Sequence, residues 1–232
     1  MRSRLLLLAF AALSVSACKN KPAFLGGPAC PPDLEQERTA KSTVLVSPIE
    51  TVVRHDLSLA AVAALPGTEK LGPGGKLQGL TVVRHQLSYK TAIAVTSPLF
   101  GGPRCAWLEK LTVDITPDKI EIYVPSEYPE ESCEYQQILL HERSHEETHR
   151  DALALASDDL RRALALAPEL PARGAPLTVA DRPEAERLIE AMVDKATKPV
   201  YADFQKTLAE RQAVIDLPEN YRWVARRCSN WK

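Results

Sequence analysis

Three of the chain's five histidines lie in one short stretch, His141-Glu-Arg-Ser-His-Glu-Glu-Thr-His149. In a helix, successive residues turn by about 100°, so His145 would lie about 40° round from His141 and one turn further along. Both imidazoles can then reach one metal ion, and zinc is the ion that such a pair typically holds, at about 2 Å. Glu142 would lie at the edge of the same face, near a metal-bound water. We therefore expect one Zn²⁺ ion with His141 and His145 as ligands and Glu142 as general base.

Hydrolysis is the chemistry that this arrangement favours. Zinc lowers the pKa of a coordinated water towards neutrality, and Glu142 would accept its proton so that hydroxide can attack a polarised carbonyl, usually that of a peptide bond. Two alternatives stay open. In one, the clustered histidines bind zinc without catalysis, in a protein that buffers or delivers the metal. In the other, the motif lies on a charged surface helix of a structural envelope protein that binds no metal.

The third protein ligand also stays open. His149 is one candidate, but it lies about 12 Å beyond His141 along a straight helix and can share the ion only if the helix bends or unwinds. Asp151 would point about 280° round from His141. The competing candidates are carboxylates of a second long helix, Glu186 and Glu190.

The residues His141-Glu142-x-x-His145 resemble the His-Glu-x-x-His motif of the zincin metallopeptidases. More closely, the chain is similar from residue 105 to about residue 164 to proteobacterial secreted proteins described as zinc-dependent proteases, whose activity is inferred from the motif. The stretches that carry this similarity are Cys105-Ala-Trp107, Ile122-Tyr-Val-Pro125, Ser132-Cys-Glu-Tyr135, the histidine motif and Asp216-x-Pro-x-x-Tyr221. The resemblance implies a zincin-like active helix and a zinc-dependent peptidase that acts on polypeptides.

The chain departs from the zincin pattern at several positions. Arg143, Glu146 and Glu147 are charged where zincins prefer uncharged residues. Thr148 and Asp151 stand where the metzincins have a glycine and the third histidine. The resemblance therefore leaves the third ligand unassigned.

Zincins also place a strand beside the active helix, where the strand pairs with an extended substrate, and the resemblance gives this role to Lys119–Val124. A tyrosine close to the motif can donate a hydrogen bond to the oxyanion of the reacting carbonyl. Tyr123, Tyr128 and Tyr135 are near the motif in sequence, although we expect each of them to be a packing residue.

Strand patterns precede helix patterns along the chain, which predicts an α+β domain with a small antiparallel sheet followed by two long helices. Residues 42–49, 80–87 and 91–96 are rich in strand formers, and residues 59–65 suit a short helix. Apolar residues alternate with polar ones before and after Pro117-Asp118, which predicts a hairpin over residues 111–124.

The helix that carries the histidine motif is predicted from Cys133 to about Ala167, with Ser132 as its N-cap. A second helical pattern runs from about Asp181 to Ile215, and Pro199 is expected to kink or break it. The first of these helices carries His141 and His145, and the second carries the candidate ligands Glu186 and Glu190.

Residues 51–58 nearly repeat as residues 81–88, each copy with a histidine, His55 and His85. A functional interpretation would place both histidines in one site. We expect instead two similar strands of one sheet, because two copies do not make a repeat architecture.

The beginning of the chain indicates export. Arg2 and Arg4 precede an apolar run over residues 5–13, which is typical of a secretory signal and too short to span a membrane. The tetrapeptide Val15-Ser-Ala-Cys18 resembles the lipobox of bacterial lipoproteins, which implies lipidation of Cys18, with ordinary signal cleavage as the alternative. Lys19 after the cysteine resembles the outer-membrane sorting pattern.

These features predict a signal peptide at residues 1–17, a lipidated flexible tether at residues 18–40, and a single α+β metallopeptidase domain at residues 41–232. The expected location is the bacterial cell envelope, at the periplasmic face of the outer membrane. Composition is that of an ordinary globular protein, with 45% hydrophobic and 25% charged residues. No basic stripe appears, so the expected partners are a polypeptide substrate and a membrane, held through the lipid on Cys18, but no nucleic acid.

Export also places the remaining four cysteines in a compartment that permits disulfides. Four cysteines allow three pairings, and the sequence does not choose among them. We favour Cys105 with Cys133, which leaves Cys30 to pair with Cys228. A structural zinc site made of cysteines is disfavoured, because none of them lies in a Cys-x-x-Cys pair.

Overall fold

A computed structural model describes residues 30, 35, 39–66, 77–96, 104–229 and 231. The predicted signal peptide and Cys18 lie outside these residues. The fold is α+β, as predicted, and its elements in chain order are β1 (Ser42–Leu45), β2 (Thr51–Arg54), α1 (Leu59–Ala63), β3 (Leu80–Val82), β4 (His85–Val95), β5 (Arg104–Pro117), β6 (Ile120–Tyr123), α2 (Cys133–Ala165), β7 (Leu177–Val179), α3 (Arg182–Ile215) and α4 (Pro218–Ala225).

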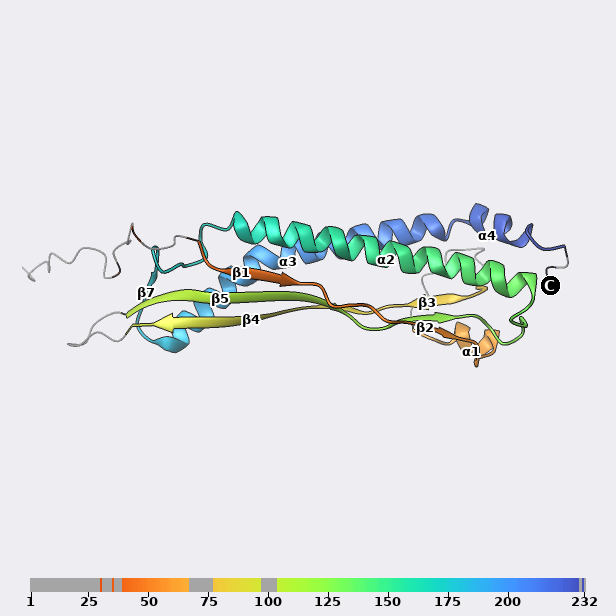
Figure 1. Cartoon of the computed structure of the whole chain (residues 1–232), viewed down its shortest axis with the longest axis horizontal. Coiled ribbons are helices and arrows are strands. Elements are labelled where there is room, and N and C mark those ends of the chain that lie inside the picture. Colours follow the sequence, from red (N-terminus) through yellow and green to blue (C-terminus); the bar gives the residue numbers. More distant parts are fainter. Residues whose placement is uncertain are drawn as a thin grey trace, which may run out of the picture.

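Two small sheets lie end to end along the molecule, and the long helix α2 runs beside both of them, whereas α3 packs on the first (Figure 1). The first sheet has the order β1-β5-β4, with β7 paired to the start of β5, and the second has the order β2-β6-β3. β4 and β3 are antiparallel to their neighbours β5 and β6, whereas β1 and β2 are parallel to theirs. The sheets are therefore mixed, where an antiparallel sheet was predicted.

The predicted hairpin over residues 111–124 is wrong. Both halves are strands, but β5 pairs with the preceding strand β4, from His85 opposite Pro117 to Val95 opposite Ala106. β6 belongs to the second sheet, where it lies between β2 and β3. Alternation along a strand shows which of its faces is buried, but it does not identify the neighbouring strand.

The near-repeat does place two similar strands in one sheet, as predicted. β2 and β3 flank β6 on its two sides. The two histidines that follow them are not neighbours in one site: His55 packs edge-on against Tyr135, whereas His85 stacks on His149.

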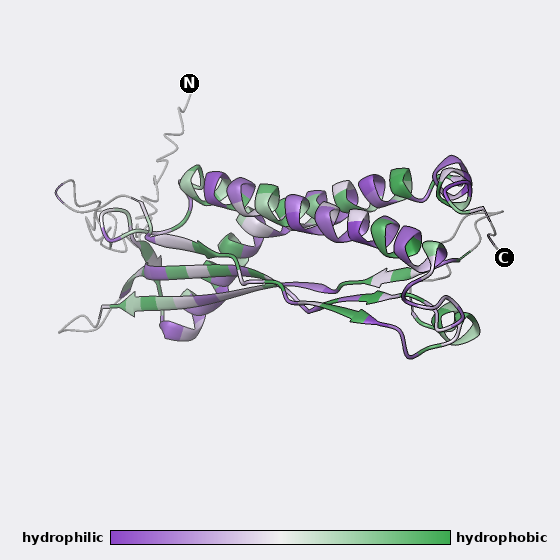
Figure 2. Ribbon diagram, turned by 45° about the vertical axis from the view of Figure 1, so that its right-hand side comes forward, coloured by the Kyte–Doolittle hydropathy of each residue, from purple (hydrophilic) through white to green (hydrophobic). Residues whose placement is uncertain are grey.

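The long helices begin and end for local reasons. The Ser132 side chain accepts a hydrogen bond from the Tyr135 amide at the start of α2, and Asp181 caps α3 in the same way. α3 continues through Pro199, so the predicted break there does not occur. Hydrophilic and hydrophobic residues alternate along both helices (Figure 2), which gives each one an apolar side for the core.

Among the described residues, three hydrophobic clusters hold the helices on the sheets, and two of them concern the helix with the histidine motif. The larger joins β5 residues Leu111, Val113 and Ile115 to α2 and α3. The smaller packs the β6 side chains against Tyr135 and Ile138 in the first turns of α2. This second core fixes the part of α2 that carries the histidine motif. In the part of the chain that the structure describes, no helix is long and apolar enough to cross a membrane.

The disulfides join Cys30 to Cys105 and Cys133 to Cys228, with Cα–Cα distances of 5.5 Å and 5.8 Å. The predicted pairs, Cys105–Cys133 and Cys30–Cys228, are therefore wrong. β5 has 14 residues, and a strand of that length spans roughly 40 Å. Cys105 lies at the start of β5, and Cys133 begins α2, beyond the far end of β5. Cys105 and Cys133 therefore lie at opposite ends of the molecule (Figure 1).

Candidate metal centre

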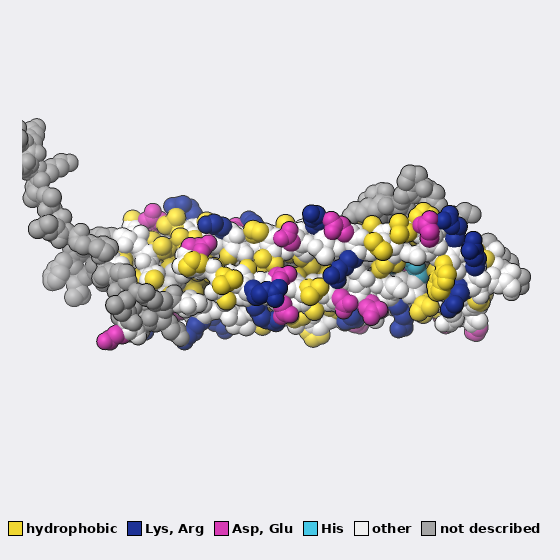
Figure 3. All heavy atoms as spheres, turned by 90° about the horizontal axis from the view of Figure 1, so that it is seen from above, with side chains coloured by type: hydrophobic (Ala, Val, Ile, Leu, Met, Phe, Trp, Pro, Cys, Tyr) yellow, Lys and Arg dark blue, Asp and Glu magenta, His cyan; other side chains and the backbone are white. Residues whose placement is uncertain are grey.

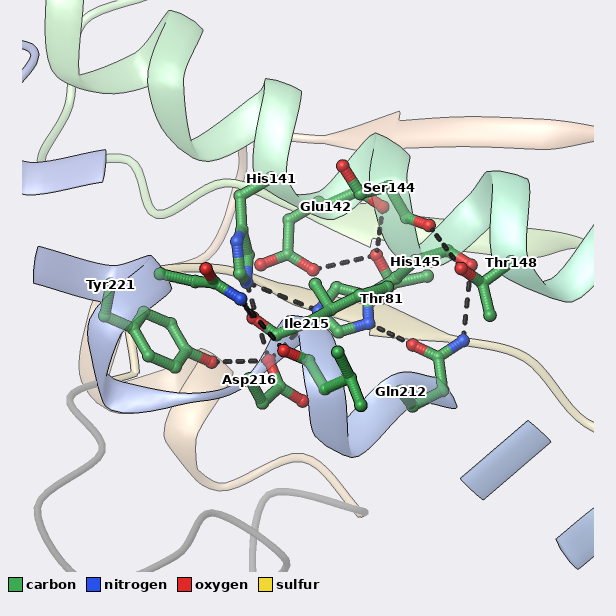
Figure 4. Close-up of polar contacts among 12 residues, drawn as sticks. Thr81, His141, Glu142, Ser144, His145, Thr148, Gln212, Ile215, Asp216 and Tyr221 are labelled. Carbon is green, nitrogen blue, oxygen red and sulfur yellow. Dashed lines mark hydrogen bonds and ion pairs between the residues drawn. The ribbon is translucent and has the colours of Figure 1, made fainter. Parts of the chain in front are cut away.

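Three side chains from two distant segments converge at one end of the molecule. His141 and His145 project from the same face of α2, and Asp216 follows the last residue of α3 (Figure 4). The Nε2 atoms of the two histidines lie 3.3 Å apart. Asp216 Oδ1 lies 3.5 Å from Nε2 of His141 and 3.1 Å from Nε2 of His145. These three residues form a group that could hold a metal ion, and the predicted ligands His141 and His145 both belong to it.

The spacing of this group fits a zinc ion. Ligand atoms about 2.0–2.1 Å from a tetrahedral centre lie about 3.3 Å from one another. The three observed separations, 3.1, 3.3 and 3.5 Å, bracket that value. Two imidazole nitrogens and one carboxylate oxygen also match the donor set of catalytic zinc sites, in which three protein ligands leave a fourth position open.

Gln212 orients one of the ligands. Its side-chain oxygen accepts a hydrogen bond from Nδ1 of His145, and its amide nitrogen donates to the backbone oxygen of His145 at 3.3 Å. With the proton on Nδ1, Nε2 keeps its lone pair for a metal ion. Metal-binding histidines usually have such a partner on the second ring nitrogen.

The charges at the site favour a cation between these residues. Burial alone would lower the pKa of His145, but its hydrogen bond to Asp216 and the charges of Glu142 and Asp216 raise it to about 8. Burial would raise the pKa of Asp216, yet its hydrogen bonds to His141 and His145 hold it well below the usual range. Without metal, a proton on the imidazoles therefore balances the carboxylate, and a metal cation can take the place of that proton.

Glu142 lies beside the group and is held on its other side by β3. Only 4% of Glu142 is exposed. The Thr81 hydroxyl donates to Glu142 Oε2 at 2.8 Å, and Figure 4 shows the carboxylate on the side of the two imidazoles. Burial raises the pKa of Glu142, against the opposing effect of the nearby histidines. A carboxylate with a raised pKa is suited to accept a proton near neutral pH.

Gly79 allows this close approach of the chain to Glu142. A Cβ atom at position 79 would lie 2.7 Å from Cγ2 of Ile138 and 2.8 Å from Oε1 of Glu142. Any larger residue would have to displace one of these side chains. Glycine is therefore the residue that lets the segment before β3 cover the carboxylate.

Tyr221 of α4 is a further member of the site. Its hydroxyl donates to Asp216 Oδ1 at 2.7 Å, and its ring centroid lies 5.0 Å from that of His141. Burial and the hydrogen bond to Asp216 raise the pKa of Tyr221, so the phenol stays protonated and remains a donor. The other tyrosines considered from the sequence lie elsewhere: Tyr135 packs on His55, Tyr128 lies near Trp231, and Tyr123 ends β6.

His149 is not part of the metal group. It lies one turn beyond His145 and stacks on His85, with ring centroids 5.2 Å apart. Burial, with a smaller effect of His85, lowers the pKa of His149 to about 3. His149 is therefore a neutral, packed residue.

The remaining candidates for the third ligand are also wrong. Asp151 is an exposed residue of α2, and Glu186 forms an ion pair with Arg182 at 3.6 Å. Glu186 and Glu190 lie in the first turns of α3, whereas Asp216 follows its last turn. A helix rises about 1.5 Å per residue, so the two glutamates are roughly 40 Å from the metal group.

Sequence reasoning missed four residues of the site: Asp216, Gln212, Tyr221 and Thr81. Gln212 and Asp216 are spaced to share one helix face, and Asp216 belongs to the Asp-x-Pro-x-x-Tyr stretch already associated with the zinc-dependent proteases. Had Cys133 been paired with Cys228, the segment around Asp216 would have been placed close to the helix that carries the histidine motif.

The centre is reachable from outside. The Asp216 side chain is 34% exposed, compared with 8% for His141. Seen from the helix side, histidine atoms reach the surface among hydrophobic side chains, towards the end that carries α4 (Figure 3). An external ligand can therefore approach the group past Asp216.

No known protein family, curated protein or solved structure matches this chain. The geometry of the metal group therefore carries the functional inference.

Proposed function

We propose that the protein is a zinc-dependent metallohydrolase, specifically a peptidase, with His141, His145 and Asp216 as ligands of one Zn²⁺ ion and Glu142 as general base. The observation that carries this proposal is the convergence of the three ligand atoms, all within 4.8 Å of one another, beside a buried glutamate. The resemblance of His141-Glu142-x-x-His145 to the zincin motif supports it.

The residues of the chain divide the work of peptide hydrolysis among them. A zinc ion supplies Lewis acidity, which polarises a carbonyl and makes water more acidic. Glu142 accepts a proton from the attacking water and returns it to the leaving amine, so that one water and one peptide bond give a carboxylate and an amine. Thr81 holds the Glu142 carboxylate in place through its 2.8 Å hydrogen bond. The Tyr221 hydroxyl donates to Asp216 Oδ1 at 2.7 Å and so holds that carboxylate in its proposed ligand position.

The surroundings suit a polypeptide substrate. β6 cannot pair with it, since β2 and β3 occupy both its edges, so the predicted role of Lys119–Val124 is wrong. β3 takes that role in our proposal: within the described residues it pairs with β6 alone, and its Thr81 contacts Glu142. Exposed apolar side chains next to the ligands, Leu140 and Leu217 among them, offer contacts for substrate side chains.

We also propose that the chain acts in the bacterial cell envelope, anchored through lipid on Cys18 at the periplasmic face of the outer membrane. The charged start, the apolar run and the lipobox-like tetrapeptide support this location. The two disulfides support it as well, because such bonds persist in oxidising compartments.

Metal content and hydrolysis together test the function. The purified chain should contain close to one zinc per molecule by atomic emission, and a His141→Ala/His145→Ala variant should contain none. Glu142→Gln should keep the zinc but lose cleavage of a denatured protein substrate by a factor of about a hundred or more. Zinc binding with no Glu142-dependent cleavage would favour the non-catalytic zinc-binding lipoprotein, and absence of zinc from the native chain would favour a structural one.

A further inference from the structure

The metal group is assembled from two segments that are held in very different ways. His141 and His145 belong to the first half of α2, which packs on the smaller core through Tyr135 and Ile138. Asp216 lies in the turn between α3 and α4, and Tyr221 belongs to α4. The site is complete only when this turn lies against α2.

Few contacts hold that turn in place. Leu208 is the last buried residue of α3, and Val224 is the one buried residue of α4. The described polar contacts across to α2 are those among the site residues, an exposed hydrogen bond of 3.3 Å from Arg227 to Gln137, and a 3.6 Å contact between Cys133 Sγ and the Arg227 backbone oxygen. Trp231, beyond Cys228, packs on the smaller core, but the segment around Asp216 itself has little apolar packing.

The Cys133–Cys228 disulfide supplies the missing connection. Cys133 is the first residue of α2, about two turns before His141, and Cys228 follows shortly after α4. The bond therefore closes a ring that contains all the metal ligands and Tyr221. We propose that this disulfide is a redox switch of the metal centre, so that the chain binds metal tightly only after the bond has formed; this inference rests on the proposed metal site.

The physical reason is the cost of ordering the turn. When the bond is open, residues beyond Leu208 can leave α2, and Asp216 occupies its ligand position for only a fraction of the time. Metal binding must then order the segment, and the apparent affinity for the metal is reduced in proportion to the fraction of chains in which Asp216 is already in place. For an exported chain, the site would become competent only in an oxidising compartment.

The switching step is ordinary thiol–disulfide exchange. An external disulfide takes up the two electrons and two protons that the Cys133 and Cys228 thiols lose, and it becomes two thiols as the protein bond forms. An external dithiol reverses the step and is itself oxidised to a disulfide. One sulfur of the protein pair is accessible for this exchange, because Cys133 is exposed whereas Cys228 is buried.

The second disulfide provides a matched control. Cys30–Cys105 closes a comparably long loop, with a sequence separation of 75 residues against 95. Both bonds should therefore restrict the unfolded chain to a similar degree. Cys105 lies at the start of β5, at the other end of the molecule from the metal group (Figure 1).

The test is Zn²⁺ affinity, measured by competition with a chromophoric chelator on the native chain and on two double variants. Cys133→Ser/Cys228→Ser should lower the affinity about tenfold or more, and Cys30→Ser/Cys105→Ser should leave it within about twofold. Serine replacement also removes thiolates that would otherwise bind zinc themselves. Equal losses in the two variants, or no loss in the first, would overturn the proposal.

If the Cys133→Ser/Cys228→Ser chain does not fold, a second measurement takes its place. The folded Cys30→Ser/Cys105→Ser chain is reduced with a phosphine, its thiols are alkylated, and the Zn²⁺ affinity is compared before and after. An unchanged affinity again contradicts the switch. A native, oxidised chain that binds no Zn²⁺ would refute the metal centre itself, whereas tight binding that ignores the disulfide would refute the switch alone.

Discussion

Three histidines of α2 belong to two pairs, one in charged and one in apolar surroundings. His141 and His145 face a carboxylate, and Gln212 holds the second ring nitrogen of His145. One turn further, His149 stacks on His85 of β4, whose ring also meets Phe204 edge-on. Nδ1 of His149 and Nε2 of His85 are buried and have no hydrogen-bond partner among the described residues.

Burial does not distinguish the two pairs. His145 is 7% exposed and His149 is 8% exposed. Nevertheless, the pKa of His145 rises to about 8, whereas burial lowers that of His149 to about 3. The difference comes from the residues that other elements bring to each imidazole, Asp216 in one case and the His85 ring in the other. A metal site on this helix therefore depends on the segment that arrives opposite it.

Replacing Asp216 should have the largest effect. Asp216→Ala removes one of the three proposed ligands and should lower the Zn²⁺ affinity about a hundredfold or more, because two imidazoles alone hold the ion weakly. His149→Leu, one turn away, should change the affinity by less than about twofold, since His149 is outside the ligand group. Competition with a chelator measures both values. A large loss in His149→Leu, with Asp216→Ala unaffected, would reverse the assignment of the two pairs.

Replacing Gln212 should have a smaller effect on the same property. Gln212→Ala frees Nδ1 of His145, so the imidazole can rotate or place its proton on Nε2. Loss of such an outer partner typically lowers metal affinity about 10- to 100-fold. Gln205→Ala, earlier on α3, is the control, and it should leave the affinity unchanged. Equal affinities of native and Gln212→Ala chains would show that Gln212 does not orient the ligand.

The features of the site that follow from local pattern were predictable from the sequence. The helix cap at Ser132, the two histidines one turn apart and the second long helix all depend on residues near one another in the chain. The α+β class follows from the order of these patterns.

What the sequence left open depends on long-range pairing. Asp216 reaches His145 only because α3 returns antiparallel to α2, and Thr81 reaches Glu142 only because β3 pairs with β6. The disulfide predictions failed for the same reason, since the pairing depends on which distant segments lie together in the fold. Hydrophobic period identifies elements and faces, but not the partner that each face meets.

The two histidine pairs should also give opposite dependences of stability on pH in the metal-free chain. In the unfolded chain His149 has a pKa of about 6.5 and takes up a proton below that pH, whereas in the folded chain it stays neutral down to pH about 3. Stability therefore falls as pH falls below about 6.5, by up to about 1.4 kcal/mol per pH unit. The folded pKa of His145 is raised, so its contribution is complete below about 6.5 and is lost as pH rises through about 8.

Urea unfolding of the native, His149→Leu and Asp216→Ala chains between pH 4.5 and 8.5 measures both slopes. His149→Leu should flatten the acidic limb relative to the native chain, and Asp216→Ala should flatten the basic limb. Taking differences from the native chain cancels the contribution of surface carboxylates. An acidic limb that survives unchanged in His149→Leu would mean that His149 takes up a proton in the folded state.

The smallest effects should come from two tyrosine hydroxyls, one beside each histidine pair. Tyr201 donates to the backbone oxygen of His85 at 2.6 Å, and Tyr221 donates to Asp216 at 2.7 Å. Tyr201→Phe should lower the free energy of unfolding by about 1 kcal/mol and leave Zn²⁺ affinity unchanged, because it removes a structural hydrogen bond. Tyr221→Phe should lower Zn²⁺ affinity a few-fold, since the hydroxyl that it removes donates to the proposed ligand Asp216. If Tyr221→Phe, like Tyr201→Phe, changed stability and left Zn²⁺ affinity unchanged, Tyr221 would be a structural residue and not part of the metal site.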